Sequence, residues 1–165
     1  MPSCEYDLGY LQASICELET YLLSKELYWP LSAASPLGEP AYSRLTLGGL
    51  LLSLERSRSR CLTPSQSAQL AHIETQLERT LSRWRAAWGR KAQWEFRSRL
   101  RQWENYLNEL QRDPEAHAAF FRHEARLREM IDLLKPYMDA PTQADLELLN
   151  ELDMLLPTLQ IPDGI

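Results

Sequence analysis

Valine is absent from this chain of 165 residues, and glycine, cysteine and histidine are scarce, with six, three and three copies. Valine and the other β-branched residues favour strands, and only a few isoleucines and threonines remain to take that role. Much of the rest is leucine, glutamate, arginine, alanine and glutamine, which are good helix formers. The composition therefore predicts an all-α fold.

Long apolar runs and paired cysteines are also missing. No apolar stretch reaches the roughly 18 to 20 residues that a helix needs to cross a bilayer, and the first residues are acidic rather than basic. The cysteines Cys4, Cys16 and Cys61 are odd in number and share no CxxC spacing, which favours a reducing compartment over a disulfide framework. We therefore expect a cytoplasmic protein that does not enter the membrane.

Motifs for metal, cofactor or catalytic chemistry do not occur. The histidines His72, His117 and His123 lack the spacings that place two metal ligands on one helical face, and neither of the last two follows a carboxylate by three residues. Gly48 and Gly49 precede leucines rather than the Lys-Ser/Thr of a phosphate-binding loop. No nucleophile is singled out, so we expect no metal, no cofactor and no catalytic residue.

Basic residues are concentrated in the middle of the chain, although the net charge is −5. Between Arg79 and Arg101 there are eight basic residues and one acidic residue, Glu95, whereas both ends of the chain are acidic. Acidic helices that pack beside the basic one are the simplest explanation of this distribution.

Apolar spacing predicts an antiparallel bundle of helices. Proline and glycine mark the segments between them, including a loop or arm at 31–43, and we expect an extended tail at 158–165. The predicted helices cover about 5–27, 46–60, 64–112, 115–135 and 142–157. We expect residues 1–165 to form a single helical domain.

The longest predicted helix begins at a strong start signal and has no clear internal stop. Thr63 is suited to cap it, Pro64 fits the first helical position, and Gln66 completes a capping box. Apolar residues then recur from Leu70 to Leu110 with a mean spacing of about 3.64 residues, close to that of an unstrained helix. Such a helix is roughly 73 Å long, which exceeds a compact domain of this size. Either it kinks or splits at Gly89, or the bundle is elongated and other helices or a second copy cover the long helix. We favour the elongated bundle and, with it, a homodimer.

Five arginines fall on the side of this helix opposite the apolar residues. Trp94 lies among them, an arrangement found in proteins that bind phosphate groups or nucleic acid. The alternative is a solvated face, or one paired with other helices of the same chain. The acidic net charge argues against nucleic acid as the partner. The residues of this predicted stripe are Arg79, Arg83, Arg90, Arg97 and Arg101.

A second candidate site is a group of charges on the apolar side of the same helix. Lys91, Glu95 and Arg99 are spaced four residues apart, and His123 on the next helix is expected to reach the same layer. Buried charges must pair, because an isolated ion in an apolar interior is costly. Three interpretations follow. The group is a pocket for a small anion or carboxylate in a binding protein or an enzyme, a polar layer that fixes the helix register, or an exposed face.

Aromatic residues at the start of the 31–43 arm form a third candidate. Tyr28 and Trp29 lie in a stretch without helical periodicity, next to Pro30. They either clamp over the core of their own chain or anchor the arm on a second subunit, where tryptophan and tyrosine are favoured.

These patterns together favour a non-enzymatic helical interaction or scaffold protein that self-associates or binds a protein partner. Its contact surfaces are the arginine stripe with Trp94 and the aromatic arm. A ligand-binding or enzymatic bundle that uses Lys91, Glu95, Arg99 and His123 is the alternative, and nucleic-acid binding through the stripe is a weaker one. The sequence identifies no particular ligand or partner.

Overall fold

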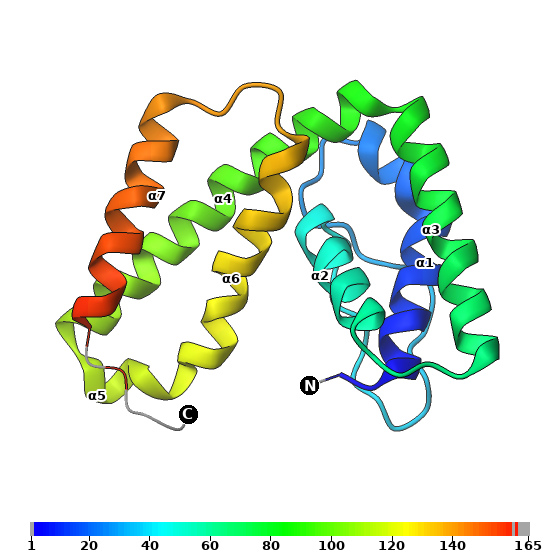
Figure 1. Cartoon of the computed structure of the whole chain (residues 1–165), viewed down its shortest axis with the longest axis horizontal. Helices are drawn as coiled ribbons and strands as arrows, with labels where there is room; N and C mark the ends of the chain where they lie inside the picture. Colours follow the sequence, from blue (N-terminus) through cyan, green and yellow to red (C-terminus); the bar gives the residue numbers. More distant parts are fainter. Residues whose placement is uncertain (1, 160, 162–165) are drawn as a thin grey trace. The chain divides into compact units, whose positions relative to one another are not determined.

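The structure, a computed structural model, describes residues 2–159 and 161. It confirms the all-α prediction (Figure 1), and the only β pairing within the described residues is an isolated bridge between Trp29 and Leu45. The main helices are α1 (Cys4–Leu23), α2 (Leu47–Arg58), α3 (Pro64–Arg83), α4 (Arg85–Arg112), α5 (Pro114–His117), α6 (Phe121–Leu134) and α7 (Gln143–Leu155). Short 3-10 turns follow three of them, at Ala118–Phe120, Lys135–Tyr137 and Leu156–Thr158.

The chain divides into two compact units, Met1–Ala92 and Gln93–Ile165, and α4 contributes its beginning to the first and its remainder to the second. The prediction of a single domain stays a prediction. No helix among the described residues has both the length and the apolar composition required to span a membrane.

In the first unit, α1 is the central element and lies between α2 and α3 (Figure 1). Its apolar face buries Leu11 and Leu18 completely, and α2 and α3 add Leu50 and Ile73 to the same core. Apolar surface removed from water at this core is the main source of the unit's stability.

The second unit contains residues 93–112 of α4 together with α6 and α7 (Figure 1). Its core is apolar and aromatic. Ion pairs join α7 to both other helices, from Arg97 on α4 to Asp145 and from Arg128 on α6 to Asp153. The completely buried core side chains include Phe96, Leu100, Leu107, Ile131 and Leu134.

The predicted helix over 64–112 is two helices, and this is a correction to the sequence analysis. The break is at Trp84, where φ is −119° and ψ is 36°. Gly89 lies inside α4 and does not interrupt it. The Trp84 N–H still donates to the Thr80 carbonyl oxygen at 2.9 Å, and the Trp84 carbonyl oxygen accepts from the Trp88 N–H at 2.9 Å. The chain therefore changes direction at one residue without losing the hydrogen bonds on either side.

The other segment boundaries lie close to the predicted ones, with a few shifts. The first helix ends at Leu23 rather than Leu27, and the predicted 115–135 helix contains a 3-10 turn between α5 and α6. Residues 31–43 contain no helix or strand, as predicted. Thr158 ends a 3-10 turn, so the predicted tail does not begin there, and residues 160 and 162–165 of that tail lie outside the described residues.

Candidate interaction surface

The outward face of α4 in the second unit carries an aromatic ring beside two cationic side chains. Trp94, Arg97 and Arg101 are spaced three and four residues apart, which places them in one row along the helix. Trp94 is 47 % exposed, and the side chains of Arg97 and Arg101 are 50 % and 65 % exposed. We call these three residues the α4 surface.

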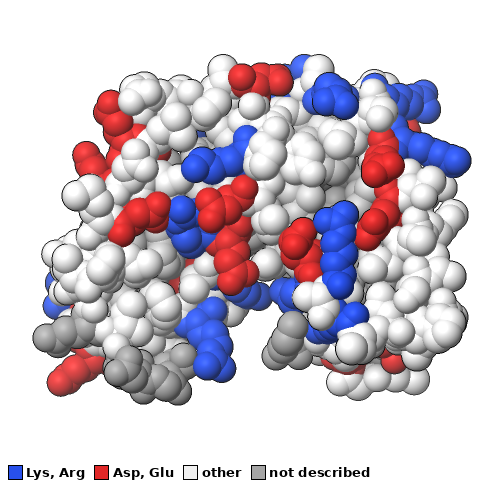
Figure 2. Space-filling model, in the orientation of Figure 1, with Lys and Arg blue, Asp and Glu red and all other residues white. Residues whose placement is uncertain are grey.

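Both arginines of the α4 surface already pair with acids of their own unit. Arg97 Nε lies 3.0 Å from Asp145 Oδ2 on α7, and Arg101 Nη1 lies 3.0 Å from Glu104 Oε2 one turn further along α4. Pairs this exposed contribute little to stability and exchange readily with other partners. Figure 2 shows basic and acidic side chains interspersed on the visible face, without one extended basic patch.

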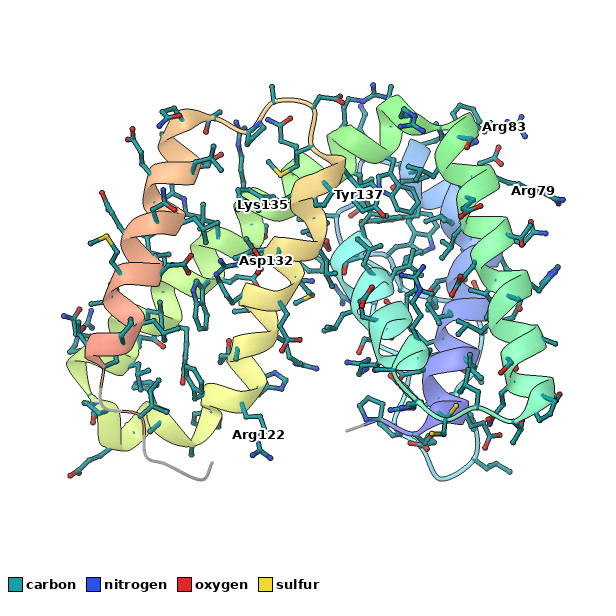
Figure 3. All side chains as sticks on the ribbon, in the orientation of Figure 1. Arg79, Arg83, Arg122, Asp132, Lys135 and Tyr137 are labelled. Atoms are coloured by element: carbon teal, nitrogen blue, oxygen red, sulfur yellow. The ribbon has the colours of Figure 1, made fainter. Side chains whose placement is uncertain are left out.

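The break at Trp84 places Arg79 and Arg83 of the predicted stripe on a different helix from the α4 surface. Arg79 and Arg83 are exposed on α3 and point away from its packed face (Figure 3). Arg83 stacks over the Trp84 ring, 5.2 Å from its centroid, and approaches Glu19 of α1 at 4.0 Å. Arg90 is exposed on α4 in the first unit. The structure thus splits the stripe between two helices.

Lys91 lies in the first unit and is only 4 % exposed. Its Nζ donates to the Ser24 carbonyl oxygen at 2.9 Å, to Ser24 Oγ at 3.3 Å and to the Glu26 carbonyl oxygen at 2.6 Å. It also lies 4.5 Å from the centroid of the Tyr21 ring. Burial lowers the pKa of Lys91. The ammonium group binds the chain just after the end of α1, where a positive charge complements the helix dipole.

Glu95 and Arg99 stay together in the second unit. Glu95 is completely buried, and its Oε1 lies 3.7 Å from Arg99 Nη2. Arg99 Nη1 donates to Gln102 Oε1 at 3.2 Å, and the Gln102 amide donates to Ser98 Oγ at 3.2 Å. These contacts form a polar layer along α4, and the register-fixing interpretation stays a prediction.

His123 does not join that layer through its hydrogen bonds. It is exposed at the start of α6, where Arg126 contacts its ring nitrogens at 2.9 and 3.0 Å. Of the four residues predicted to form a ligand pocket, the structure brings together Glu95 and Arg99. It places Lys91 against the end of α1 and His123 at the surface.

The aromatic arm folds against α1 of its own unit. Trp29 and Leu45 exchange two backbone hydrogen bonds, of 3.0 and 2.7 Å. The Trp29 indole N–H donates to Glu17 Oε1 at 3.3 Å, and its ring meets Tyr21 edge to face. Tyr28 is half-buried beside it. These contacts favour the clamp interpretation over an arm that reaches a second subunit.

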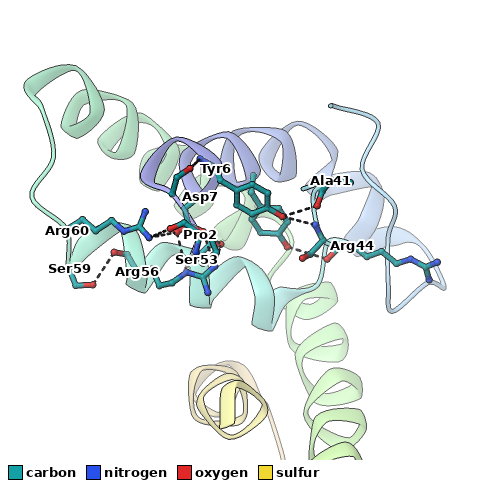
Figure 4. Close-up of polar contacts among 12 residues, drawn as sticks. Pro2, Tyr6, Asp7, Ala41, Arg44, Ser53, Arg56, Ser59 and Arg60 are labelled. Atoms are coloured by element: carbon teal, nitrogen blue, oxygen red, sulfur yellow. Dashed lines mark hydrogen bonds and ion pairs between the residues drawn. The ribbon is translucent and has the colours of Figure 1, made fainter. Parts of the chain in front are cut away.

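Sequence reasoning missed a buried charge cluster at the other end of α1 (Figure 4). Asp7 is completely buried, and its carboxylate accepts from Arg56 Nη2 at 2.9 Å, from Ser53 Oγ at 3.1 Å and lies 3.2 Å from Arg60 Nη2. Arg60 also donates to the Pro2 carbonyl oxygen. The available signal was an acid on the apolar face of α1 together with two arginines four residues apart, one on α2 and one just after its end. The cluster joins α1 to the end of α2 through the Asp7 carboxylate, and Arg60 Nη1 is buried in it without a hydrogen-bond partner among the described residues.

Among the described residues, no group of histidine, cysteine, aspartate and glutamate side chains has the geometry to hold a metal ion. No protein-family model matches the chain, and neither the curated proteins nor the solved structures contain a significant match to it.

Proposed function

We propose that this chain is a non-enzymatic helical interaction protein that self-associates through the α4 surface. The observation that carries the proposal is the exposed Trp94 ring in a row with Arg97 and Arg101. Tryptophan and arginine are the residues that most often dominate the binding energy of protein interfaces. The ion pairs of both arginines are exposed, so a partner's carboxylates compete for them at little cost.

The aromatic arm, which the sequence offered as a second contact surface, supports this proposal less. Its tryptophan is bound to Glu17 and Leu45 of the same unit. The contacts of Lys91 and His123 likewise give no support to the ligand-binding alternative, because Lys91 binds the chain just after α1 and His123 lies at the surface against Arg126. We therefore base the proposed function on the α4 surface alone.

Sedimentation velocity over a range of concentrations tests the proposal. We expect the wild-type chain to form a dimer, and Trp94→Ala to shift it toward the monomer. Phe120→Ala is the matched control, because Phe120 is another exposed aromatic residue of the second unit, at 57 % compared with 47 % for Trp94. A wild-type chain that stays monomeric at every concentration contradicts the proposal. So does equal weakening by both variants, or a Trp94-dependent shift that appears only on addition of nucleic acid at low salt.

A further inference from the structure

The outward face of α7 carries a row of side chains that complements the α4 surface. Glu147 and Glu151 are exposed, and Met154 is 76 % exposed. These residues are spaced four and three apart, so they share one face of the helix. We call them the α7 row.

The spacing of the α7 row matches the α4 surface when the two helices run antiparallel. Read toward the N-terminus, the α4 surface is Arg101, Arg97 and Trp94, also with steps of four and three residues. Both rows extend over seven residue steps, or roughly 10.5 Å along the helix axis. Glu147 then faces Arg101, Glu151 faces Arg97, and Met154 faces Trp94. In a parallel alignment Trp94 faces a carboxylate and Met154 faces a guanidinium, so the chemistry matches only in the antiparallel register.

We infer that the partner of the α4 surface is the α7 row of a second copy of this chain, packed antiparallel. The inference rests on the proposed function and names its partner. Two glutamates opposite two arginines supply charge complementarity, which sets orientation and suppresses wrong registers. At the end of the contact the Met154 thioether packs on the Trp94 ring, a favourable sulfur–aromatic pair. Each copy carries both rows, so two copies can form the contact twice.

The bonds that the α4 surface makes within its own unit are compatible with this contact. The hydrogen bond from Arg97 to Asp145 uses Nε, and a guanidinium has further donors on its two terminal nitrogens. Asp145 shows directly that α7 carboxylates bind this arginine. Arg101 contacts Glu104 of its own helix in an exposed pair, which a carboxylate from another chain can replace.

Charge exchange between the two rows tests the inference. Arg101→Glu leaves a dimer with acid against acid, and Glu147→Arg leaves one with base against base. We expect each variant alone to raise the dimer dissociation constant about tenfold or more in sedimentation equilibrium. An equimolar mixture restores opposite charges at both contacts, so its dissociation constant should return to within about threefold of wild type. Circular dichroism of each variant establishes that both remain folded.

Arg122→Glu is the matched control, because Arg122 is exposed at the start of α6, outside both rows (Figure 3). We expect it to leave the dissociation constant at the wild-type value on its own, and to leave the dimerisation defect of Glu147→Arg uncorrected when the two variants are mixed. A mixture of Arg101→Glu and Glu147→Arg that stays monomeric overturns the α7 assignment. If Trp94→Ala still weakens the dimer in that case, the proposed function stands and only its partner row is wrong. If Trp94→Ala has no effect, the proposed function fails as well.

Discussion

Lys91 Nζ lies 2.6 Å from the carbonyl oxygen of Glu26, which ties the beginning of α4 to the chain just beyond α1. No basic residue occupies the last turn of α1 itself. The ammonium group therefore comes from a residue 65 positions away in sequence and binds the carbonyl oxygens of Ser24 and Glu26, just after the end of α1.

Replacing Lys91 by methionine should lower the free energy of unfolding by about 3 kcal/mol, because it leaves two carbonyl oxygens and a hydroxyl without their charged donor. Methionine preserves most of the side-chain volume, so the loss reports on the ammonium group. Urea denaturation followed by circular dichroism measures the effect. Lys25→Met is the control, since Lys25 is exposed in the same unit and its replacement should change the free energy by less than about 0.5 kcal/mol. Equal stability of the two variants would show that Lys91 is not a structural anchor.

Asp7→Asn should lower the free energy of unfolding by about 3 kcal/mol as well. The substitution keeps the shape of the side chain but leaves Arg56 and Arg60 with an uncompensated positive charge in a largely buried cluster. Glu74→Gln offers a comparison, because Glu74 accepts from Arg58 at 3.1 Å at an exposed position of the same unit. That variant should lower the free energy of unfolding by less than about 1 kcal/mol. An Asp7→Asn protein as stable as Glu74→Gln would contradict the assignment of the cluster as a helix clamp.

Gly9 of α1 leaves room for the hydroxyl group of Tyr42. A Cβ atom at this position would lie 2.3 Å from Tyr42 Oη, and the next atom of the ring would lie 3.4 Å away. Gly9→Ala should therefore destabilise the wild-type chain by about 1 to 2 kcal/mol, since overpacking forces Tyr42 to move. In a Tyr42→Phe background the close contact disappears, and alanine should become neutral or stabilising, because it is the better helix former. A thermal-melting double-mutant cycle measures this coupling. Additive effects of the two substitutions would rule out the steric explanation.

Glu17 should make the stability of the first unit depend on pH in the acid range. The Ser32 backbone N–H donates to its carboxylate at 3.0 Å and, with Trp29 and the Ser32 hydroxyl, holds the pKa of Glu17 below its usual value of 4.5. A carboxyl group with a lowered pKa stabilises the fold above the unfolded value, and this contribution is lost as the pH falls through the folded value.

Glu17→Gln should consequently melt below wild type at pH 6, and the difference should shrink once the pH falls below about 4.5. Melting curves of both proteins at several pH values between 3 and 6 measure this difference in melting temperature. Glu19→Gln provides a control, because Glu19 is exposed on the same helix and makes only a 4.0 Å contact with Arg83. A difference between wild type and Glu17→Gln that stays constant over this range would contradict the role of the carboxylate.

Helix starts were predictable because their signals are local. The Thr63 and Gln66 side chains form the reciprocal bonds of the predicted capping box, at 3.2 and 3.0 Å. Thr46 and Thr142 likewise accept from the third residue after them, at 3.0 and 3.2 Å. Each cap needs only three or four neighbouring residues, so the sequence contains all the information for it.

The break at Trp84 was not predictable from periodicity. Leu81, Trp84 and Trp88 keep helical spacing on both sides of the break. A single non-helical residue leaves the spacing of the apolar residues nearly unchanged. The cause lies in the packing of the first unit. α3 packs against α1, and beyond Arg83 the chain must turn for Trp88 to be buried and for Lys91 to reach Glu26. These contacts are far apart in sequence, so only the folded chain specifies them.

The candidate surfaces also divide into features that local spacing predicts and features that depend on contacts between helices. The row of Trp94, Arg97 and Arg101 follows from spacing within one helix and is present in the structure, whereas its predicted extension to Arg79 and Arg83 depended on a straight axis through Trp84. The group of Lys91, Glu95, Arg99 and His123 depended on how separate helices meet. The structure pairs Glu95 with Arg99, whereas Lys91 binds the chain after α1 and His123 is exposed on α6.

The sequence by itself determined the all-α composition, the helix caps and the face that each helix exposes, because these depend on propensities and spacings within a few turns. Tertiary structure alone decided where the long apolar pattern breaks and which charges are buried together. It also decided which arginines share a surface. Those outcomes depend on burial and on contacts between residues distant in the chain, such as Asp7 with Arg56, which no local pattern encodes.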